Sequence, residues 1–212
     1  QRRIQMLAYQ LFPLTTQKMS GEEFLERLEG HPYLREELGE LSGLLAVRTE
    51  LPAHRIPGMP DDWPLLLYGR YEIREILTAV GWLTESRRTP FQAGVLALED
   101  AKIENLFVTL DKTEGYHDRI AYRDYAVSPE IFHWQTQNAA GPDTPAGRRY
   151  IESPENGWRF FLFVRENKEV AYCALGPVTK LQVEGDRPMS LHWKLAVPLP
   201  MALFRAFSVL RA

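Results

Sequence analysis

The feature that most constrains this chain is a change in the spacing of its apolar residues. In the first third they recur every three or four positions, as on one face of a helix, whereas from about residue 94 they recur every second position. The second part holds seven short segments rich in β-branched and aromatic residues, separated by turn-forming pairs such as Asn-Gly and Gly-Pro. They are GVLALED, ENLFVTL, IAYRDYAV, WRFFLFVRE, EVAYCALG, VTKLQVEG and MSLHWKLA. About seven strands over about 110 residues predict a barrel or a strongly curved sheet.

The N-terminal part predicts three helices. Ser20 and Glu23 have the spacing of a capping box, and Gly30 ends that helix. The segment 31–48 places five leucines on one stripe: Leu34, Leu38, Leu41, Leu44 and Leu45. Further helices are predicted over YGRYEIREILTAVG and PLPMALFRAFSVL.

Proline marks the preferred boundary, because it fixes backbone angles and removes a hydrogen-bond donor. Four prolines lie between residues 51 and 64. We therefore predict an α+β chain in three parts. A helical arm (1–50) is followed by a Pro-rich connector (51–64). The third part is a barrel-like domain (65–212), whose curved and mainly antiparallel sheet has flanking helices.

Composition indicates a globular protein, with 45% hydrophobic and 25% charged residues. A net charge of -3 argues against a bulk cationic coat for nucleic acid but permits a small basic groove. No apolar run approaches the roughly 18 residues of a membrane span, and no signal peptide is evident. Because the chain starts at Gln1, we expect a piece of a longer protein. Cys173 is the only cysteine and is expected to be buried and inert, which favours a cytoplasmic setting.

Several catalytic motifs are missing from the sequence, including the P-loop, H-E-x-x-H, C-x-x-C and G-x-S-x-G. The five histidines lack metal-ligand spacing, so neither a metal nor a cofactor is expected. Asp111 and Lys112, after an apolar strand, leave a magnesium-dependent nuclease as an alternative. However, adjacent strand residues face opposite ways, so a charged strand end is the simpler interpretation.

Aromatic, amide and arginine side chains alternate between residues 68 and 138. Aromatic faces stack on bases, arginines neutralise phosphates, and amides read base edges, although core packing remains the simpler role for any one aromatic. The stretch FHWQTQN (132–138) is the densest example. Strand alternation puts Phe132, Trp134 and Thr136 on one face and His133, Gln135 and Gln137 on the other.

The longer stretch YRDYAVSPEIFHWQTQNAAGPDTPAGRRYI, followed by FLFVRENK, ALGPVTKLQVEGDRPMSLHWKL and PLP, resembles a known family. It is similar to the C-terminal domain, of unassigned function, of large bacterial helicase-like proteins, several of which carry a phospholipase-D-type nuclease before the helicase. FHWQTQN, GDRPMS and LGP are the most specific phrases, YGRYEI and PFQAGVL…FVTLDK fit in order, and the resemblance covers about residues 65–200.

The resemblance implies the target-recognition domain of ATP-dependent, modification-directed (type IV) restriction enzymes. Its partners would be duplex DNA with a modified cytosine and the upstream helicase and nuclease domains of the same polypeptide. The chain itself would not be an enzyme, and its curved sheet would be an SRA/PUA-like barrel by analogy. The alternative is a domain that docks on the helicase core or a partner protein through its leucine stripe.

A pocket around a flipped methylcytosine needs aromatic faces, an acceptor for the amino group, amides and an apolar niche for the methyl. We expect Asp111 or Asp124 as the acceptor and Val95 beside the methyl. The candidate DNA- and base-binding residues are Tyr68, Arg70, Tyr71, Arg74, Arg87, Arg88, Phe91, Gln92, Val95, Asp111, Lys112, Tyr122, Asp124, Tyr125, His133, Trp134, Gln135, Gln137 and Asn138.

Overall fold

The computed structural model describes residues 1–12, 19–48, 54–84, 93–110 and 124–208, together with Arg87 and Phe91. Two compact units are formed. The first comprises Gln1–Arg55, Pro60–Leu66 and Tyr71–Phe91, and the second comprises Ile56–Met59, Leu67–Arg70 and Gln92–Ala212. The chain is therefore α+β, with helices in the first unit and most of its strands in the second.

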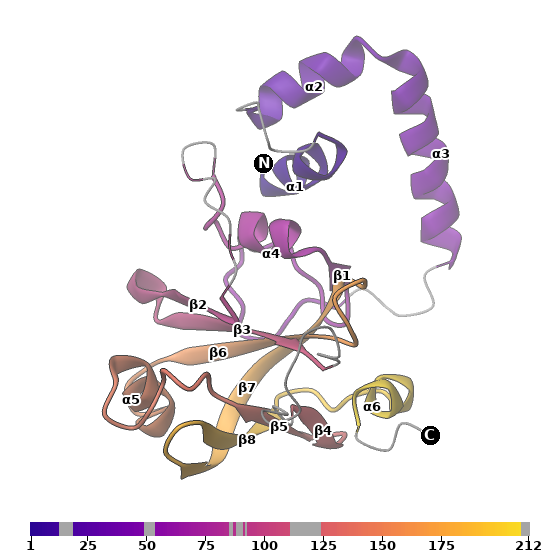
Figure 1. The fold of residues 1–212 in the computed structure, drawn as a ribbon. Coiled ribbons are helices and arrows are strands. Elements are labelled where there is room, and N and C mark those ends of the chain that lie inside the picture. The colour runs from indigo at the N-terminus through magenta and orange to yellow at the C-terminus, as the bar shows by residue number, and fades with distance from the viewer. Residues whose placement is uncertain are drawn as a thin grey trace. The chain divides into compact units, whose positions relative to one another are not determined.

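The first unit contains four described helices, α1 (Arg2–Leu11), α2 (Gly21–Glu29), α3 (Pro32–Arg48) and α4 (Ile73–Ala79) (Figure 1). Helix α1 contacts both α2 and α4, and α2 contacts α3. The predicted capping box is confirmed: Ser20 Oγ accepts from the Glu23 backbone N–H at 3.1 Å, and Glu23 Oε2 accepts from the Ser20 backbone N–H at 2.8 Å.

The helix predicted from Tyr68 begins only at Ile73. The preceding residues pair with the sheet of the second unit: the Tyr68 backbone N–H donates to Ala174 O at 2.7 Å, and the Ala174 N–H donates to Gly69 O at 2.9 Å. A short strand, β1 (Arg70–Tyr71), follows. These sheet hydrogen bonds outweigh the helical periodicity of the segment.

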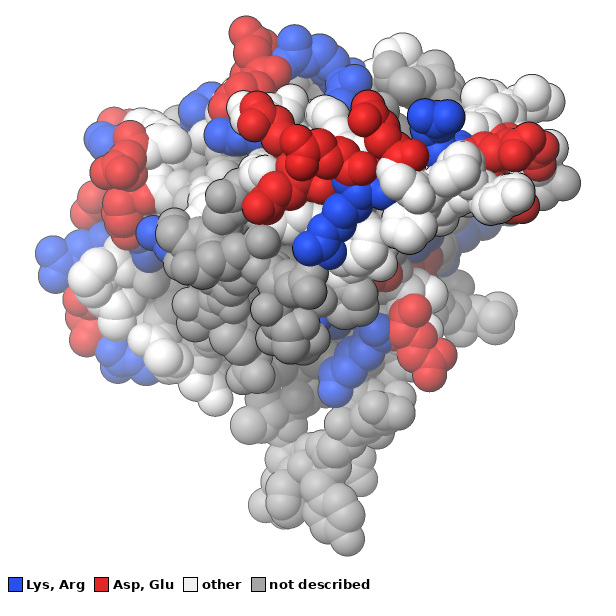
Figure 2. All heavy atoms as spheres, turned by 90° about the horizontal axis from the view of Figure 1, so that it is seen from above, with Lys and Arg blue, Asp and Glu red and all other residues white. Residues whose placement is uncertain are grey.

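The leucine stripe of α3 is largely open to solvent. Leu41, Leu44 and Leu45 are 52%, 58% and 56% exposed. Exposed glutamates accompany them on α2 and α3, and Figure 2 shows these acidic side chains gathered with basic ones between them. Helix α3 thus exposes an apolar stripe within an acidic surface.

The second unit is built on a strongly curved sheet (Figure 1). Its strands follow the order β2 (Val95–Leu98), β3 (Ile103–Thr109), β6 (Arg159–Arg165), β7 (Tyr172–Gly185), β8 (Met189–Leu195), β5 (Ile131–Gln135) and β4 (Tyr125–Ser128), and β1 pairs with β7. Only β3 and β6 pair in parallel; the other neighbours along this path are antiparallel. The end strands β2 and β4 are not paired with each other, so the described sheet is open rather than a closed barrel.

Two details of the sheet differ from the sequence prediction. YCALG of the first predicted segment continues through Pro177 into VTKLQVEG as one 14-residue strand, β7, and the register of β7 with β6 shifts at Leu175, just before Gly176 and Pro177. The residues IFHWQ form a strand of their own, β5, between β8 and β4. An irregular register lets a strand run on past a point that looks like a turn.

The core of the second unit is dominated by aromatic rings. Trp134, Tyr150, Phe160 and Trp193 meet with ring centroids 4.9 to 6.3 Å apart. Tyr150 comes from α5 (Pro145–Ile151), and Phe207 of α6 (Met201–Phe207) is fully buried in the same cluster. Both helices therefore pack on the sheet. Among the described residues, no helix combines the length and the apolar character needed to cross a membrane.

Candidate functional site

A cavity of about 470 Å³ lies in the second unit between the two ends of the open sheet. Strands β2 and β3 line it from one end of the strand order, and β5 with the residue before β4 lines it from the other. The ends come close together, because a Cβ added at Gly94 would lie 3.2 Å from Gln137 Nε2. The lining residues are Ala93, Gly94, Val95, Phe107, Val108, Thr109, Asp124, Trp134, Gln135, Gln137, Arg165 and Tyr172.

The polar side of the cavity carries one carboxylate and two amides. Asp124 Oδ1 accepts from the Gln135 backbone N–H at 2.9 Å, which orients the carboxylate. Gln135 Nε2 donates to Ser190 Oγ at 3.0 Å, while Gln137 is exposed at the rim. Together they offer an acceptor and amides to a flat ligand.

The apolar side is built from aromatic rings held by their neighbours. Phe107 stacks on Phe163 and meets Tyr172 edge-on, both with centroids 5.5 Å apart. Trp134 meets Tyr150 edge-on at 5.3 Å. Because these rings are packed from behind, the wall that they form is rigid.

Five of the predicted binding residues line this cavity together: Val95, Asp124, Trp134, Gln135 and Gln137. The predicted alternation in FHWQTQN also holds, since Phe132, Trp134 and Thr136 are buried whereas Gln135 and Gln137 are partly or fully exposed. His133, although on the second face, is buried against Tyr125, with ring centroids 5.1 Å apart.

Other predicted residues lie away from the cavity. Tyr68 donates to Pro198 O at 2.7 Å, Arg70 pairs with Glu166 at 2.7 and 3.0 Å, and the Tyr71 hydroxyl accepts from the Leu66 N–H at 3.0 Å. Arg74 is exposed on α4, Asn138 is exposed in a turn, and Phe91 and Arg87 contact Trp82. The remaining predictions fall outside the described residues: Arg88, Gln92, Asp111, Lys112 and Tyr122.

Sequence reasoning did not select Phe107, Thr109, Arg165 or Tyr172, which also line the cavity. Phe107 lies within β3, and Thr109, Arg165 and Tyr172 are terminal residues of strands whose sequences look like ordinary core segments. The parallel pairing of β3 with β6 places Thr109 opposite Arg165 across 55 intervening residues, and no local pattern predicts that pairing. The adjacency of polar residues to strand ends was the one available signal.

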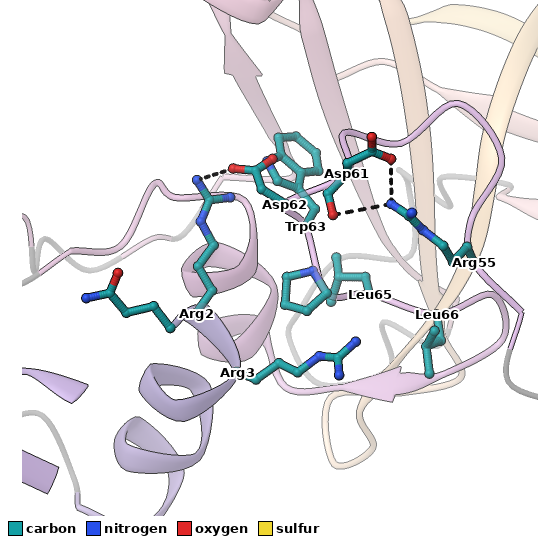
Figure 3. Close-up of a pocket in the computed structure, with 10 residues that line it drawn as sticks. Arg2, Arg3, Arg55, Asp61, Asp62, Trp63, Leu65 and Leu66 are labelled. Atoms are coloured by element: carbon teal, nitrogen blue, oxygen red, sulfur yellow. Dashed lines mark hydrogen bonds and ion pairs between the residues drawn. The ribbon is translucent and has the colours of Figure 1, made fainter. Parts of the chain in front are cut away.

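A second hollow, of about 570 Å³, lies in the first unit (Figure 3). Its arginines are mostly paired: Arg2 reaches Asp62 at 2.8 Å, and Arg55 reaches Asp61 at 2.8 Å. Trp63 is its only aromatic lining residue among those described. Neutralised cations and a single ring suit a base or phosphate less well than the first cavity does.

Cys173 of β7 is buried, as expected. Burial raises the pKa of its thiol to about 12. The thiol therefore stays protonated at neutral pH, which argues against a nucleophilic role.

Comparison with known proteins gives one family. No curated protein matches the chain. The model of a family described as a domain of unknown function, DUF3427, matches residues 65–207. Because this match spans well over half of the 212 residues, the chain belongs to the DUF3427 family.

Proposed function

We propose that this chain is a non-catalytic recognition module that binds duplex DNA containing 5-methylcytosine and holds the flipped base in the cavity of the second unit. One observation carries the proposal: a carboxylate, amides, aromatic rings and a small apolar side chain line one base-sized cavity. Asp124 would accept from the cytosine amino group, Gln135 and Gln137 would read the base edge, and Val95 would contact the methyl.

The resemblance to the C-terminal part of helicase–nuclease fusions supplies the wider setting of the proposal. The module would direct an upstream helicase and nuclease of the same polypeptide to modified DNA in a bacterial cytoplasm, as in type IV restriction. DNA cleavage and ATP hydrolysis would belong to those upstream domains.

The test is a pair of duplexes that differ by one methylated cytosine, titrated at a fixed salt of about 0.1 M. We expect about tenfold or more tighter binding to the methylated duplex. Asp124→Asn should weaken binding of the methylated duplex by about tenfold, because it replaces the charged acceptor of the cytosine amino group and so weakens a hydrogen bond of about 1–3 kcal/mol. Asp143→Asn, which removes an exposed carboxylate paired with Arg187, is the matched control and should leave the affinity for the methylated duplex unchanged.

A second candidate function rests on the exposed stripe of α3. An apolar helix face of this kind suits docking on a protein surface, such as the helicase core. Equal affinity for the methylated and unmethylated duplexes would contradict the proposal that the chain recognises the methyl group. Absence of binding to either at low ionic strength would favour docking as the main role.

A further inference from the structure

Arg165 is a cation in the wall of the cavity that the proposed base contacts do not use. It is the last residue of β6, and its guanidinium is held in place from three sides. Nε donates to Thr109 Oγ1 at 2.9 Å, Nη1 donates to Lys168 O at 3.3 Å, and Cζ lies 4.4 Å from the centroid of the Tyr172 ring. This support fixes the position of the charge.

Among the described residues, no acid matches the charge of Arg165. Within the described part of the chain no carboxylate lies at ion-pair distance from it, whereas Arg70 and Arg149 both pair with glutamates. Its other terminal nitrogen, Nη2, makes no hydrogen bond to the described residues. A partly buried, oriented guanidinium with unused donors is a ready partner for an oxyanion.

The lining of the cavity therefore carries two chemically different kinds of group. Asp124 and Gln137 come from the β4–β5 end of the sheet, and Arg165 comes from the β3–β6 side. A nucleotide has the same division, with a neutral base that offers an amino group and a phosphate that offers oxyanions. A flipped nucleotide carries its phosphates with it on the DNA backbone.

We propose that Arg165 binds a phosphate adjacent to the flipped nucleotide, so that the cavity recognises a backbone-linked nucleotide rather than a base alone. This inference rests on the proposed function. Arginine suits the role because its planar fork matches two phosphate oxygens, whereas a lysine acts as a point charge. The contact would form only when the base leaves the stack.

The test combines a protein change with a change in the DNA. The duplex with one 5-methylcytosine is prepared with its normal phosphates, or with an uncharged methylphosphonate immediately 5′ or 3′ of the modified base. Wild type and Arg165→Gln are titrated with each. One of the two methylphosphonates should weaken wild-type binding about tenfold, and Arg165→Gln should weaken binding of the normal duplex by a similar factor. In Arg165→Gln, the same methylphosphonate should weaken binding little further, because the protein change and the DNA change remove the same contact.

Two further variants control for charge and for folding. Arg159→Gln removes a charge at the opposite end of β6, where the side chain is exposed and donates to Gly58 O at 2.8 Å, and it should keep the full wild-type penalty. Arg165→Lys retains the charge and should keep part of the penalty, which is informative even where glutamine perturbs the fold.

The outcomes separate this inference from the proposed function. Equal methylphosphonate penalties in wild type and Arg165→Gln would overturn the phosphate contact, and a retained preference for methylated DNA would leave the recognition function standing. If wild type showed no preference for methylated DNA, both the recognition function and the phosphate contact would be overturned.

Discussion

Glu104 of β3 is a buried carboxyl group in the second unit. Its side chain is fully buried; Oε1 accepts from the Tyr150 hydroxyl, and Oε2 lies 3.1 Å from Arg149 Nε without hydrogen-bond alignment. Burial raises the pKa of the Glu104 carboxyl, opposed in part by the hydrogen bond from Tyr150 and the charge of Arg149. The carboxylate ties α5 to the sheet, but it does so against a desolvation penalty.

Replacement of Glu104 by Gln should change the pH dependence of stability. The folded state binds the Glu104 proton more tightly than the unfolded state does, so this residue contributes stability at low pH that is lost as the pH rises through the raised pKa. In urea unfolding, the free energy of unfolding of wild type should therefore rise relative to that of Glu104→Gln as the pH is lowered from about 8 to about 4. Glu99→Gln, at the exposed partner of Arg149, is the control and should cost less than about 1 kcal/mol at either pH. A gap between wild type and Glu104→Gln that stays constant with pH would contradict the assignment.

For individual residues, the sequence shows which side chains are suited to bind a base better than it shows which of them lie in the cavity. Asp124, Gln135 and Gln137 are predicted by type and do line one cavity. Tyr68 and Arg70 have equally suitable side chains, yet intramolecular partners occupy them. A one-dimensional pattern cannot distinguish these cases, because the hydrogen bonds to Pro198 and Glu166 depend on folding of segments 130 and 96 residues away.

Helix α5 shows how an element supports the cavity without lining it. Thr144 caps the helix by accepting from the Gly147 N–H at 3.0 Å and donates to Gly141 O at 2.8 Å. This brings the backbone so close that a Cβ added at Gly147 would lie 1.9 Å from Gly141 O. Tyr150, on the same helix, then packs against Trp134 in the cavity wall.

Two glycine-to-alanine changes should consequently change the free energy of unfolding in opposite directions. Gly147→Ala should lower the free energy of unfolding by about 1–3 kcal/mol, because the clash exceeds the gain in helix propensity. Gly43→Ala in α3 meets nothing within 4 Å and should raise helix stability by up to about 1 kcal/mol. Urea unfolding followed by circular dichroism measures both. Stabilisation by Gly147→Ala would show that the contact between the glycines is not retained in solution.

Strand and helix existence follow from local periodicity, whereas strand order does not. The β6–β7 hairpin is adjacent in sequence, and the segments of both strands were predicted. The parallel β3–β6 pair and the β5–β8 pair join distant segments, so their register is set by burial of the shared core. The cavity lies between such distant elements, which is why its full lining could not be predicted.

At the scale of the whole molecule, the chain carries a formal net charge of -3, and α2 and α3 display many of its exposed acids. Such a charge opposes the approach of DNA whatever the arrangement of the two units. A module of this composition must gain its affinity from a few local contacts, and long-range repulsion would lower its association rate.

Neutralising the acidic helices should therefore strengthen DNA binding without improving methyl recognition. Changing Glu26, Glu29, Glu36 and Glu40 to Gln adds four to the net charge and spares the capping residue Glu23. We expect affinity for methylated and unmethylated duplexes to rise together by about threefold at low salt, and the gain to vanish near 1 M salt, where the screening length is about 3 Å. Titrations of both duplexes across salt measure this. A gain confined to methylated DNA would instead indicate that α2 or α3 contributes to base recognition, because a long-range field cannot discriminate one methyl group.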